Sequence, residues 1–321
     1  MKKLLFIALI SVGAAGLMQS CKKETPNGGD QPLTVANKQR SLLIYSTATW
    51  CGPCGASGGP VFKNAINAMG TDDLICLDLH PALGSLSMLT PVALRDDKPA
   101  DSVFFAPFSS QLYGACLPNG YIPHFYCDNS VLGNSGVTVE QIKDFASSYN
   151  ANIAPQIGVA LNATASGNDI NIKYKMKALN ADGGDYYTSL IVIEKSFNGY
   201  QNVSGVGNTA VDHKNIVRGS AKYSSINTST TPWTNAPVAF GDVEMSNPTN
   251  GTEIEKTAKF TYKAPSQGFK DMLDGQIKPQ IGGYGFGWWN FNKSNTAVVA
   301  IVWKKEGTSW FYVNSAYADV K

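Results

Sequence analysis

The chain has 321 residues, of which 43% are hydrophobic and 16% are charged, and its formal net charge is +2. Lys2 and Lys3 account for that excess, so the rest of the chain is near neutral and lacks the clustered basic residues of a nucleic-acid-binding protein. The composition is that of a globular protein, and the length suits two domains of ordinary size.

Residues 1–20 have the pattern of a secretory signal peptide. The two lysines precede an apolar run at residues 4–17 that is too short to anchor the chain across a bilayer. Residues 17–21, Leu-Met-Gln-Ser-Cys, resemble a lipobox, in which the cysteine is acylated and becomes the mature N-terminus. Met and Gln at its centre depart from the usual pattern, so cleavage without lipidation stays open as the alternative.

Residues 21–37 are rich in proline, glycine and charge, which predicts a flexible tether, lipidated at Cys21. No later stretch is apolar enough to cross a membrane, so we expect membrane contact only through the acyl chains on Cys21. The sequence therefore predicts a protein of the cell envelope that is anchored by lipid to the outer membrane, on either its periplasmic or its surface side.

Residues 38–150 alternate between strand and helix patterns, which predicts an α/β domain. Strands are expected at residues 40–47 and 74–79, and helices at 53–69 and 138–149. Proline interrupts the first helix at Pro60, whereas the second begins with a capping-box pattern.

Residues 50–54, Trp-Cys-Gly-Pro-Cys, place two thiols between the first strand and the first helix. A cysteine just ahead of a helix has its thiolate favoured by free N–H groups and the positive end of the helix dipole, so Cys51 is the predicted nucleophile. Cys54 lies one turn later and is the predicted resolving thiol, because it can attack a mixed disulfide formed by Cys51. Half of a zinc site is the alternative, although no second cysteine pair follows.

The other cysteines have no assigned partner. After Cys21 and the active pair are set aside, Cys76, Cys116 and Cys127 remain, and three thiols cannot all pair. A local bridge between Cys116 and Cys127 is one interpretation, while Cys76 lies within a strand and is expected to be a small buried apolar side chain.

The three histidines are His80, His124 and His213. His80 ends a predicted strand and His124 follows a proline, so both are candidates to border the dithiol. A copper site made of two cysteines and one of these histidines is an alternative. His213 is expected to be structural. No metal or other cofactor is predicted.

Two motifs together resemble the thioredoxin superfamily. Residues 50–54 follow a strand as the active-site motif of that family does, and residues 120–128, Gly-Tyr-Ile-Pro-His-Phe-Tyr-Cys-Asp, agree with it. In that family a cis-proline opens the strand facing the dithiol, and Pro123 after Ile122 is the matching position. The resemblance implies a thioredoxin-like fold for residues 38–150.

The resemblance also implies the activity of a thiol-disulfide oxidoreductase. Pro123 is then a catalytic-site residue, and Trp50, Ile122 and His124 are expected to contact the substrate. The implied partners are protein thiols or disulfides and an unidentified electron donor or acceptor. Gly52 and Pro53 between the cysteines favour a reductant.

Thioredoxins carry a buried acid six residues before the first cysteine, where this chain has Tyr45. The two-residue period of a strand puts Cys76, Asp78 and His80 on one face of the neighbouring strand. Asp78 stands where thioredoxins place the lysine that faces the acid. We therefore predict that Asp78 accepts the proton of Cys54. The alternative is a carboxylate that caps a helix or is solvated at the strand end.

Residues 151–321 show short alternating runs separated by turn residues and no helical pattern, which predicts an all-β, immunoglobulin-like sandwich domain. The expected strands are 157–163, 170–176, 186–194, 254–262, 297–303 and 310–316. The whole chain resembles the thioredoxin-like outer-membrane lipoproteins of Bacteroidota, on residues 212–218 and 289–316. The second hypothesis for function is a surface binding or adhesion lipoprotein, in which the thioredoxin-like domain is a scaffold.

Overall fold

The computed structural model describes residues 32–80, 109–116, 121–134, 136–222, 238–262, 264, 267–276, 278–279, 282–284 and 291–321. The predicted signal peptide, the predicted lipidation site Cys21 and the first part of the predicted tether lie outside the described residues.

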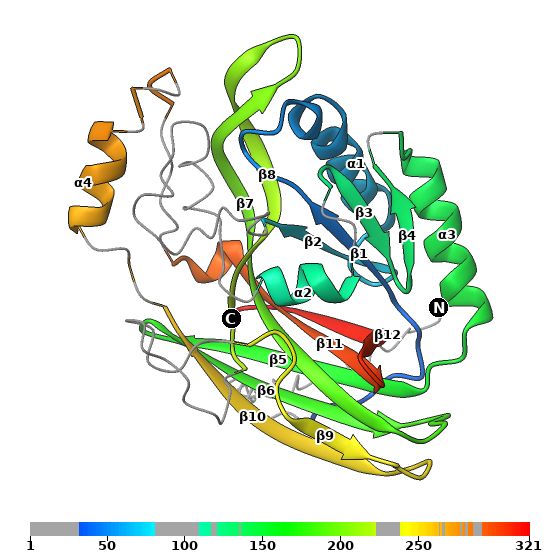
Figure 1. The fold of residues 1–321 in the computed structure, drawn as a ribbon. Coiled ribbons are helices and arrows are strands. Elements are labelled where there is room, and N and C mark those ends of the chain that lie inside the picture. The colour runs from blue at the N-terminus through cyan, green and yellow to red at the C-terminus, as the bar shows by residue number, and fades with distance from the viewer. Residues whose placement is uncertain are drawn as a thin grey trace, which may run out of the picture.

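The first part of the chain alternates strands and helices (Figure 1). Its elements are β1 (Ser41–Ser46), the π-helical turn η1 (Cys54–Gly58), α1 (Gly59–Met69), β2 (Leu74–Leu79), α2 (Ser109–Cys116), β3 (His124–Cys127), β4 (Ser130–Gly133) and α3 (Val139–Asn152). The predicted capping box of α3 is confirmed, since the side chains of Thr138 and Gln141 each accept a hydrogen bond from the other's backbone N–H.

The second part is rich in strands. Its elements are β5 (Ile157–Ser166), β6 (Asp169–Ala178), β7 (Asp185–Val203), β8 (Gly207–Ser220), β9 (Val243–Ser246), β10 (Glu253–Thr261), α4 (Gln267–Gln276), the 3₁₀ turn η4 (Lys293–Asn295), β11 (Thr296–Glu306) and β12 (Ser309–Asp319). All six expected strands are confirmed. The expectation of no helix is wrong, because α4 forms to one side of the sheets (Figure 1).

One mixed sheet of nine strands runs through both parts of the chain, in the order β12-β11-β7-β8-β2-β1-β3-β4, with β9 also paired to β7. Strands β1 and β2 are parallel, β3 is antiparallel to β1, and β8 joins the edge of β2 in parallel orientation. A second, antiparallel sheet has the order β10-β6-β5. The described residues are therefore a sheet-rich assembly in which the C-terminal strands extend the N-terminal sheet.

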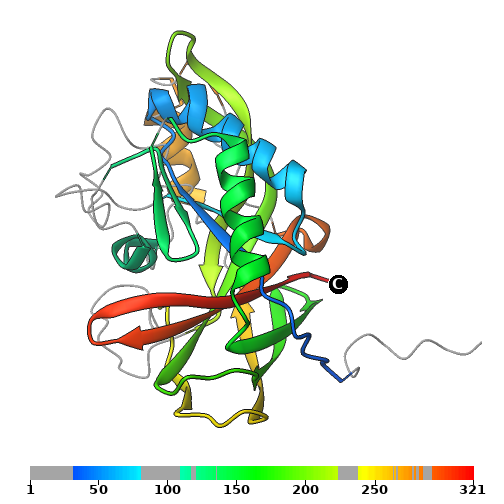
Figure 2. The same cartoon turned by 90° about the vertical axis from the view of Figure 1, so that its right-hand side faces the viewer.

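Three apolar layers hold these elements together. Side chains of β1 and β2 alternate between two faces, because successive residues of a strand point to opposite sides. On one face Leu43 and Tyr45 pack under α1 and α3, and Figure 2 shows these two helices side by side on that face. On the other face Leu42 and Ile44 pack with α2 and with Trp303 of β11. The third layer lies between the small sheet and β7, β11 and β12.

A buried acid follows β3 in the first part of the chain. Asp128 has no exposed surface and adopts a positive φ of 56°, a conformation that Asn and Asp tolerate better than other residues with a side chain. Its Oδ1 accepts a hydrogen bond from the backbone N–H of Leu42 at 2.8 Å, and Cys127, Tyr149 and Tyr312 face it without supplying a positive charge. Burial therefore raises the pKa of Asp128 to about 7.

This acid is expected to make stability depend on pH. Between about pH 4 and 7 the unfolded chain releases the proton of this carboxyl while the folded chain keeps it, so the free energy of unfolding falls as pH rises and levels off above 7. Asp128→Asn keeps an oxygen that accepts the hydrogen bond from Leu42. The parent should be more stable at pH 5 than at pH 8, and the variant should reduce this difference in the free energy of unfolding by about 2–3 kcal/mol. Urea unfolding at the two pH values measures the difference. Asp144→Asn, at an exposed helix position, is the control, and an unaltered pH difference in Asp128→Asn would contradict this account.

Candidate functional site

The dithiol lies where β1 leaves the sheet. The loop after β1 is held by two backbone hydrogen bonds, from Thr47 N to Leu79 O at 3.0 Å and from Cys51 N to Ala48 O at 3.1 Å. Cys51 and Cys54 form a disulfide with their Cα atoms 5.2 Å apart, and both are buried. The backbone N–H of Cys54 points to Sγ of Cys51 at 3.2 Å, which is the contact that stabilises a thiolate at this position.

The helix after the dithiol begins with a wide turn. The N–H of Gly59 donates to the carbonyl of Cys54, so η1 has π-helical geometry, and Pro60 then stands in the first turn of α1, where a missing N–H is tolerated. Tyr45 donates a second hydrogen bond to the same carbonyl at 3.1 Å. Because burial raises the pKa of Tyr45, its phenol stays protonated and remains a donor.

The predicted cis bond between Ile122 and Pro123 is confirmed. Ile122 packs with Trp50 against the cluster formed by Cys51, Cys54 and Ala48, so two of the predicted substrate-contacting residues meet at the dithiol. His124 begins β3 and is 7% exposed, and burial lowers the pKa of its imidazole. The roles of Pro123, Trp50, Ile122 and His124 toward a substrate stay predictions.

A hairpin from the second part of the chain lies against the dithiol, which sequence reasoning missed. The ends of β7 and β8 extend beyond the rest of the sheet, next to α1 (Figure 1). Asn202 N donates to Thr49 O at 2.7 Å, and Ser204 N donates to Gly52 O at 3.1 Å. The side chain of Gln201, 3% exposed, donates to Cys51 O at 3.0 Å and to Ala48 O at 3.2 Å. The loop that carries Cys51 is therefore positioned by residues from both the N-terminal and the C-terminal part of the chain.

Asp78 lies on the face of β2 that α1 covers. It is the register partner of Tyr45, which stacks on Phe62 of α1. The carboxylate is buried, with Nε2 of His80 at 3.4 Å and Nδ1 of His213 at 3.9 Å, and the charge of Arg218 also acts on it. The predicted placement of Asp78 and His80 on one face is thus confirmed, while the role of Asp78 as proton acceptor for Cys54 stays a prediction.

His213 is far from the dithiol in sequence and was expected to be structural. The structure places it beside Asp78 because β8 pairs with β2 through Asp78 and Ile216. No local pattern could have shown this, since the two strands are joined only in the tertiary structure. Of the described residues, Asp78, His80 and His213 are the one group of three potential metal ligands within mutual reach.

Cys76, Cys116 and Cys127 are buried free thiols. The local bridge between Cys116 and Cys127 does not form, because Cys127 points to the α1 side of the sheet and Cys116 packs on the opposite side with α2. Burial raises the pKa of all three thiols, so they are unreactive at neutral pH.

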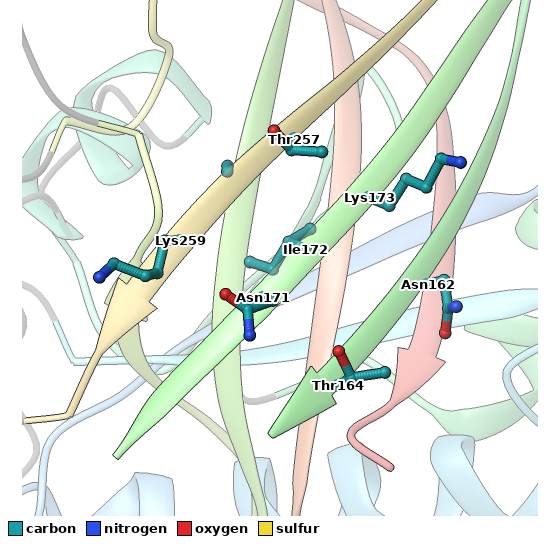
Figure 3. A pocket seen from close by; sticks show the side chains of 8 residues that line it. Asn162, Thr164, Asn171, Ile172, Lys173, Thr257 and Lys259 are labelled. Carbon is teal, nitrogen blue, oxygen red and sulfur yellow. The ribbon is translucent and has the colours of Figure 1, made fainter. Parts of the chain in front are cut away.

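A hollow of about 650 Å³ lies on the outer face of the small sheet (Figure 3). Asn162, Asn171, Lys173 and Lys259 are among its lining residues, and none of the predicted site residues lines it. Both lysines are engaged in ion pairs, Lys173 with Glu255 and Lys259 with Asp169. The hollow is open and polar and is separate from the dithiol.

The fold and the site define a disulfide-bonded Cys-Gly-Pro-Cys centre at the C-terminal end of an internal strand of a mixed sheet, beside a cis Ile122–Pro123 bond. No profile of a known protein family and no curated protein matches the chain. Its fold is similar to that of HBP35 of Porphyromonas gingivalis, with 16% identity and a TM-score of 0.56 over 89% of this chain and 77% of that one.

A domain of the outer membrane lipoprotein Omp28 from Porphyromonas gingivalis aligns with 52% of this chain and 89% of its own, at 11% identity and a TM-score of 0.27. That TM-score is too low to support an argument, and the similarity to HBP35, at 16% identity, establishes the fold alone. Among the described helices, none combines the length and the apolar character needed to cross a membrane.

Proposed function

We propose that this chain is an extracytoplasmic thiol-disulfide oxidoreductase with a thioredoxin-like centre, acting on protein disulfides as a reductant and attached to the outer membrane by lipid on Cys21. The observation that carries the proposal is the Cys51–Cys54 disulfide at the start of a helical segment, with the N–H of Cys54 directed at Sγ of Cys51 and the cis Ile122–Pro123 bond beside it.

The reaction follows from this geometry. In the reduced protein, the thiolate of Cys51 attacks one sulfur of a substrate disulfide, that S–S bond breaks, and the other substrate sulfur leaves as a thiolate. Cys54 then loses its proton and attacks Sγ of Cys51, which releases the second substrate thiolate and forms the Cys51–Cys54 disulfide. Two electrons pass to the substrate, and an external dithiol reductant restores the pair.

Substrate binding is proposed at the surface beside the cis-proline. Tyr121, at 70% exposure, leads into Ile122, and Val206 at the tip of the β7–β8 hairpin is 73% exposed. Ile122 packs at the dithiol, and Ser204 of the same hairpin donates to Gly52 O between the two cysteines. The nucleophile is only 4% exposed, so an extended polypeptide segment is the kind of substrate that fits.

The experiment is insulin reduction with dithiothreitol as the electron source, using the mature chain. The parent should accelerate precipitation of the insulin chains, and Cys51→Ser should fall to the rate of dithiothreitol alone, because the attacking thiolate is gone. Cys76→Ser is the matched control, since that thiol is buried and unreactive. Equal activity of the parent and Cys51→Ser would remove the enzyme proposal and favour the surface-binding alternative, for which the polar hollow is the available observation.

A further inference from the structure

Three potential ligand groups meet where β2 and β8 come together. Asp78 and His80 are at the end of β2 and His213 is on β8, and each offers an atom within 4.8 Å of the others. All three are well buried, with exposures of 3%, 2% and 7%. None of them is a cysteine, so the cluster is chemically separate from the dithiol.

The orientation of His213 places an electron pair toward a negative charge. Nε2 of His213 lies 3.3 Å from the carbonyl oxygen of Tyr200, and because a carbonyl only accepts, this nitrogen carries the proton. A neutral ring then has its lone pair on Nδ1, which faces Oδ2 of Asp78 at 3.9 Å. A lone pair and a carboxylate oxygen repel each other unless a cation or a proton donor lies between them, and a metal ion is a cation that both atoms can bind.

The other oxygen of Asp78 leads to the same conclusion. Oδ1 is buried and accepts no hydrogen bond from the described residues, although Nε2 of His80 lies 3.4 Å away. An ionised carboxylate in such surroundings is costly without a counter-charge. The guanidinium of Arg218 acts on Asp78 through its charge, but its hydrogen bonds go to Glu194.

The hydrogen bond of His213 also decides which ring nitrogen can bind an ion. Because Nε2 donates to the carbonyl oxygen of Tyr200, Nδ1 is the nitrogen directed at Asp78. A backbone carbonyl behind a ligating imidazole is the usual outer partner of a metal-bound histidine.

We propose that Asp78, His80 and His213 bind one divalent transition-metal ion of the Zn²⁺ type. Two imidazole nitrogens and one carboxylate oxygen suit Zn²⁺ and its neighbours, whereas Mg²⁺ and Ca²⁺ prefer all-oxygen sites. Ligand bonds of about 2.0–2.2 Å put neighbouring ligand atoms roughly 3.4 Å apart in a tetrahedron. The distances of 3.4 and 3.9 Å to the two histidines need only small side-chain shifts to reach that geometry.

Such an ion would link strand β2 of the first part of the chain to strand β8 of the second part, where their pairing is short. Strands β2 and β8 share one register pair, Asp78 with Ile216, whereas β7 and β8 pair along most of their length. The ion would tie both strands to one centre and stabilise the folded chain by binding it and not the unfolded chain. While it is bound, the carboxylate of Asp78 is a ligand and does not accept a proton, so the role predicted from the sequence belongs to the metal-free protein.

The test uses the untagged mature chain with the Cys51–Cys54 disulfide intact, so that the active thiols cannot bind metal. After removal of metal with a chelator, Zn²⁺ is added in equilibrium dialysis and Co²⁺ in a spectroscopic titration. We expect one equivalent of either ion, a higher melting temperature with Zn²⁺, and a Co²⁺ spectrum without a thiolate charge-transfer band. His80→Gln and His213→Gln should each weaken binding by about tenfold or more.

His124→Gln is the matched control, because His124 is also a buried histidine and lies outside the cluster, so its affinity for Zn²⁺ should equal that of the parent. If a cluster variant fails to fold, X-ray absorption of the Zn²⁺-loaded parent decides, and it should show two imidazoles with only nitrogen and oxygen ligands. Absence of saturable binding, sulfur ligation, or unchanged affinity in folded His213→Gln would overturn the proposal. These results do not depend on insulin reduction, so this proposal and the proposed function can fail separately.

Discussion

Replacing Arg218 by methionine is expected to destabilise the protein by about 3–5 kcal/mol, because it leaves the partner carboxylate buried without a counter-charge. Arg218 on β8 donates to Oε2 of Glu194 on β7 through Nε at 2.9 Å and Nη2 at 2.5 Å. The two side chains are 3% and 7% exposed. Burial raises the pKa of Glu194 and lowers that of Arg218 despite their mutual attraction, so desolvation is the larger effect on both groups.

The loss of stability in Arg218→Met should depend on pH. Without the guanidinium the pKa of Glu194 rises further, so the folded variant holds a proton that the unfolded chain has released, and its stability falls as pH increases from 5 to 8. Urea unfolding at both pH values measures the effect. The double variant Arg218→Met with Glu194→Leu should recover most of the loss, since an apolar pair of similar volume replaces a buried ion pair at little cost.

A neighbouring ion pair supplies the control. Lys195 lies next to Glu194 in β7 and pairs with Asp319 at 2.8 Å, with side chains 30% and 59% exposed. Lys195→Met should cost less than about 1 kcal/mol, because water screens exposed pairs. A loss in Arg218→Met no larger than that in Lys195→Met would show that the buried pair does not hold β7 and β8 together as described.

Adding one methyl group at Gly55 is expected to separate the β7–β8 hairpin from the dithiol. A Cβ at Gly55 would stand 2.8 Å from both Cγ of Gln201 and Cγ2 of Val203, and still closer to the carbonyl oxygen of Asn202. That oxygen belongs to the backbone, so the hairpin must move. We expect Gly55→Ala to lower stability by about 1–3 kcal/mol, although alanine favours a helix more than glycine does.

Displacement of the hairpin should also expose the nucleophile. Gln201 and Asn202 hold the loop of Cys51 through hydrogen bonds to Cys51 and Thr49, so their movement should speed alkylation of reduced Cys51 by iodoacetamide. Gly114→Ala is the control, because a Cβ at this helical position meets no atom within 4 Å. This variant should keep the parental alkylation rate, and its stability should be unchanged or slightly raised. Parental stability and alkylation rates in Gly55→Ala would contradict the close approach of the hairpin.

The sequence by itself determined the features that depend on neighbouring residues. The Cys51–Cys54 pair and the capping box at Thr138 were predicted because a few adjacent side chains specify each, and the cis bond at Pro123 was predicted from the resemblance to thioredoxins. Strands such as β2 were predicted with their bounds, because a run of apolar residues buried on both faces gives a strong local signal.

The tertiary structure alone decided which distant segments meet at the site. The first half of β8, around Asn208 and Asp212, lies outside the hydrophobic clusters. It is polar and lacks the alternation of apolar residues typical of a strand, so only its pairing with β7 defines it as a strand. That pairing carries Gln201 to the dithiol loop and His213 to Asp78. The physical reason is that strand pairing uses backbone groups that every residue possesses, so the side-chain pattern does not encode the partner strand.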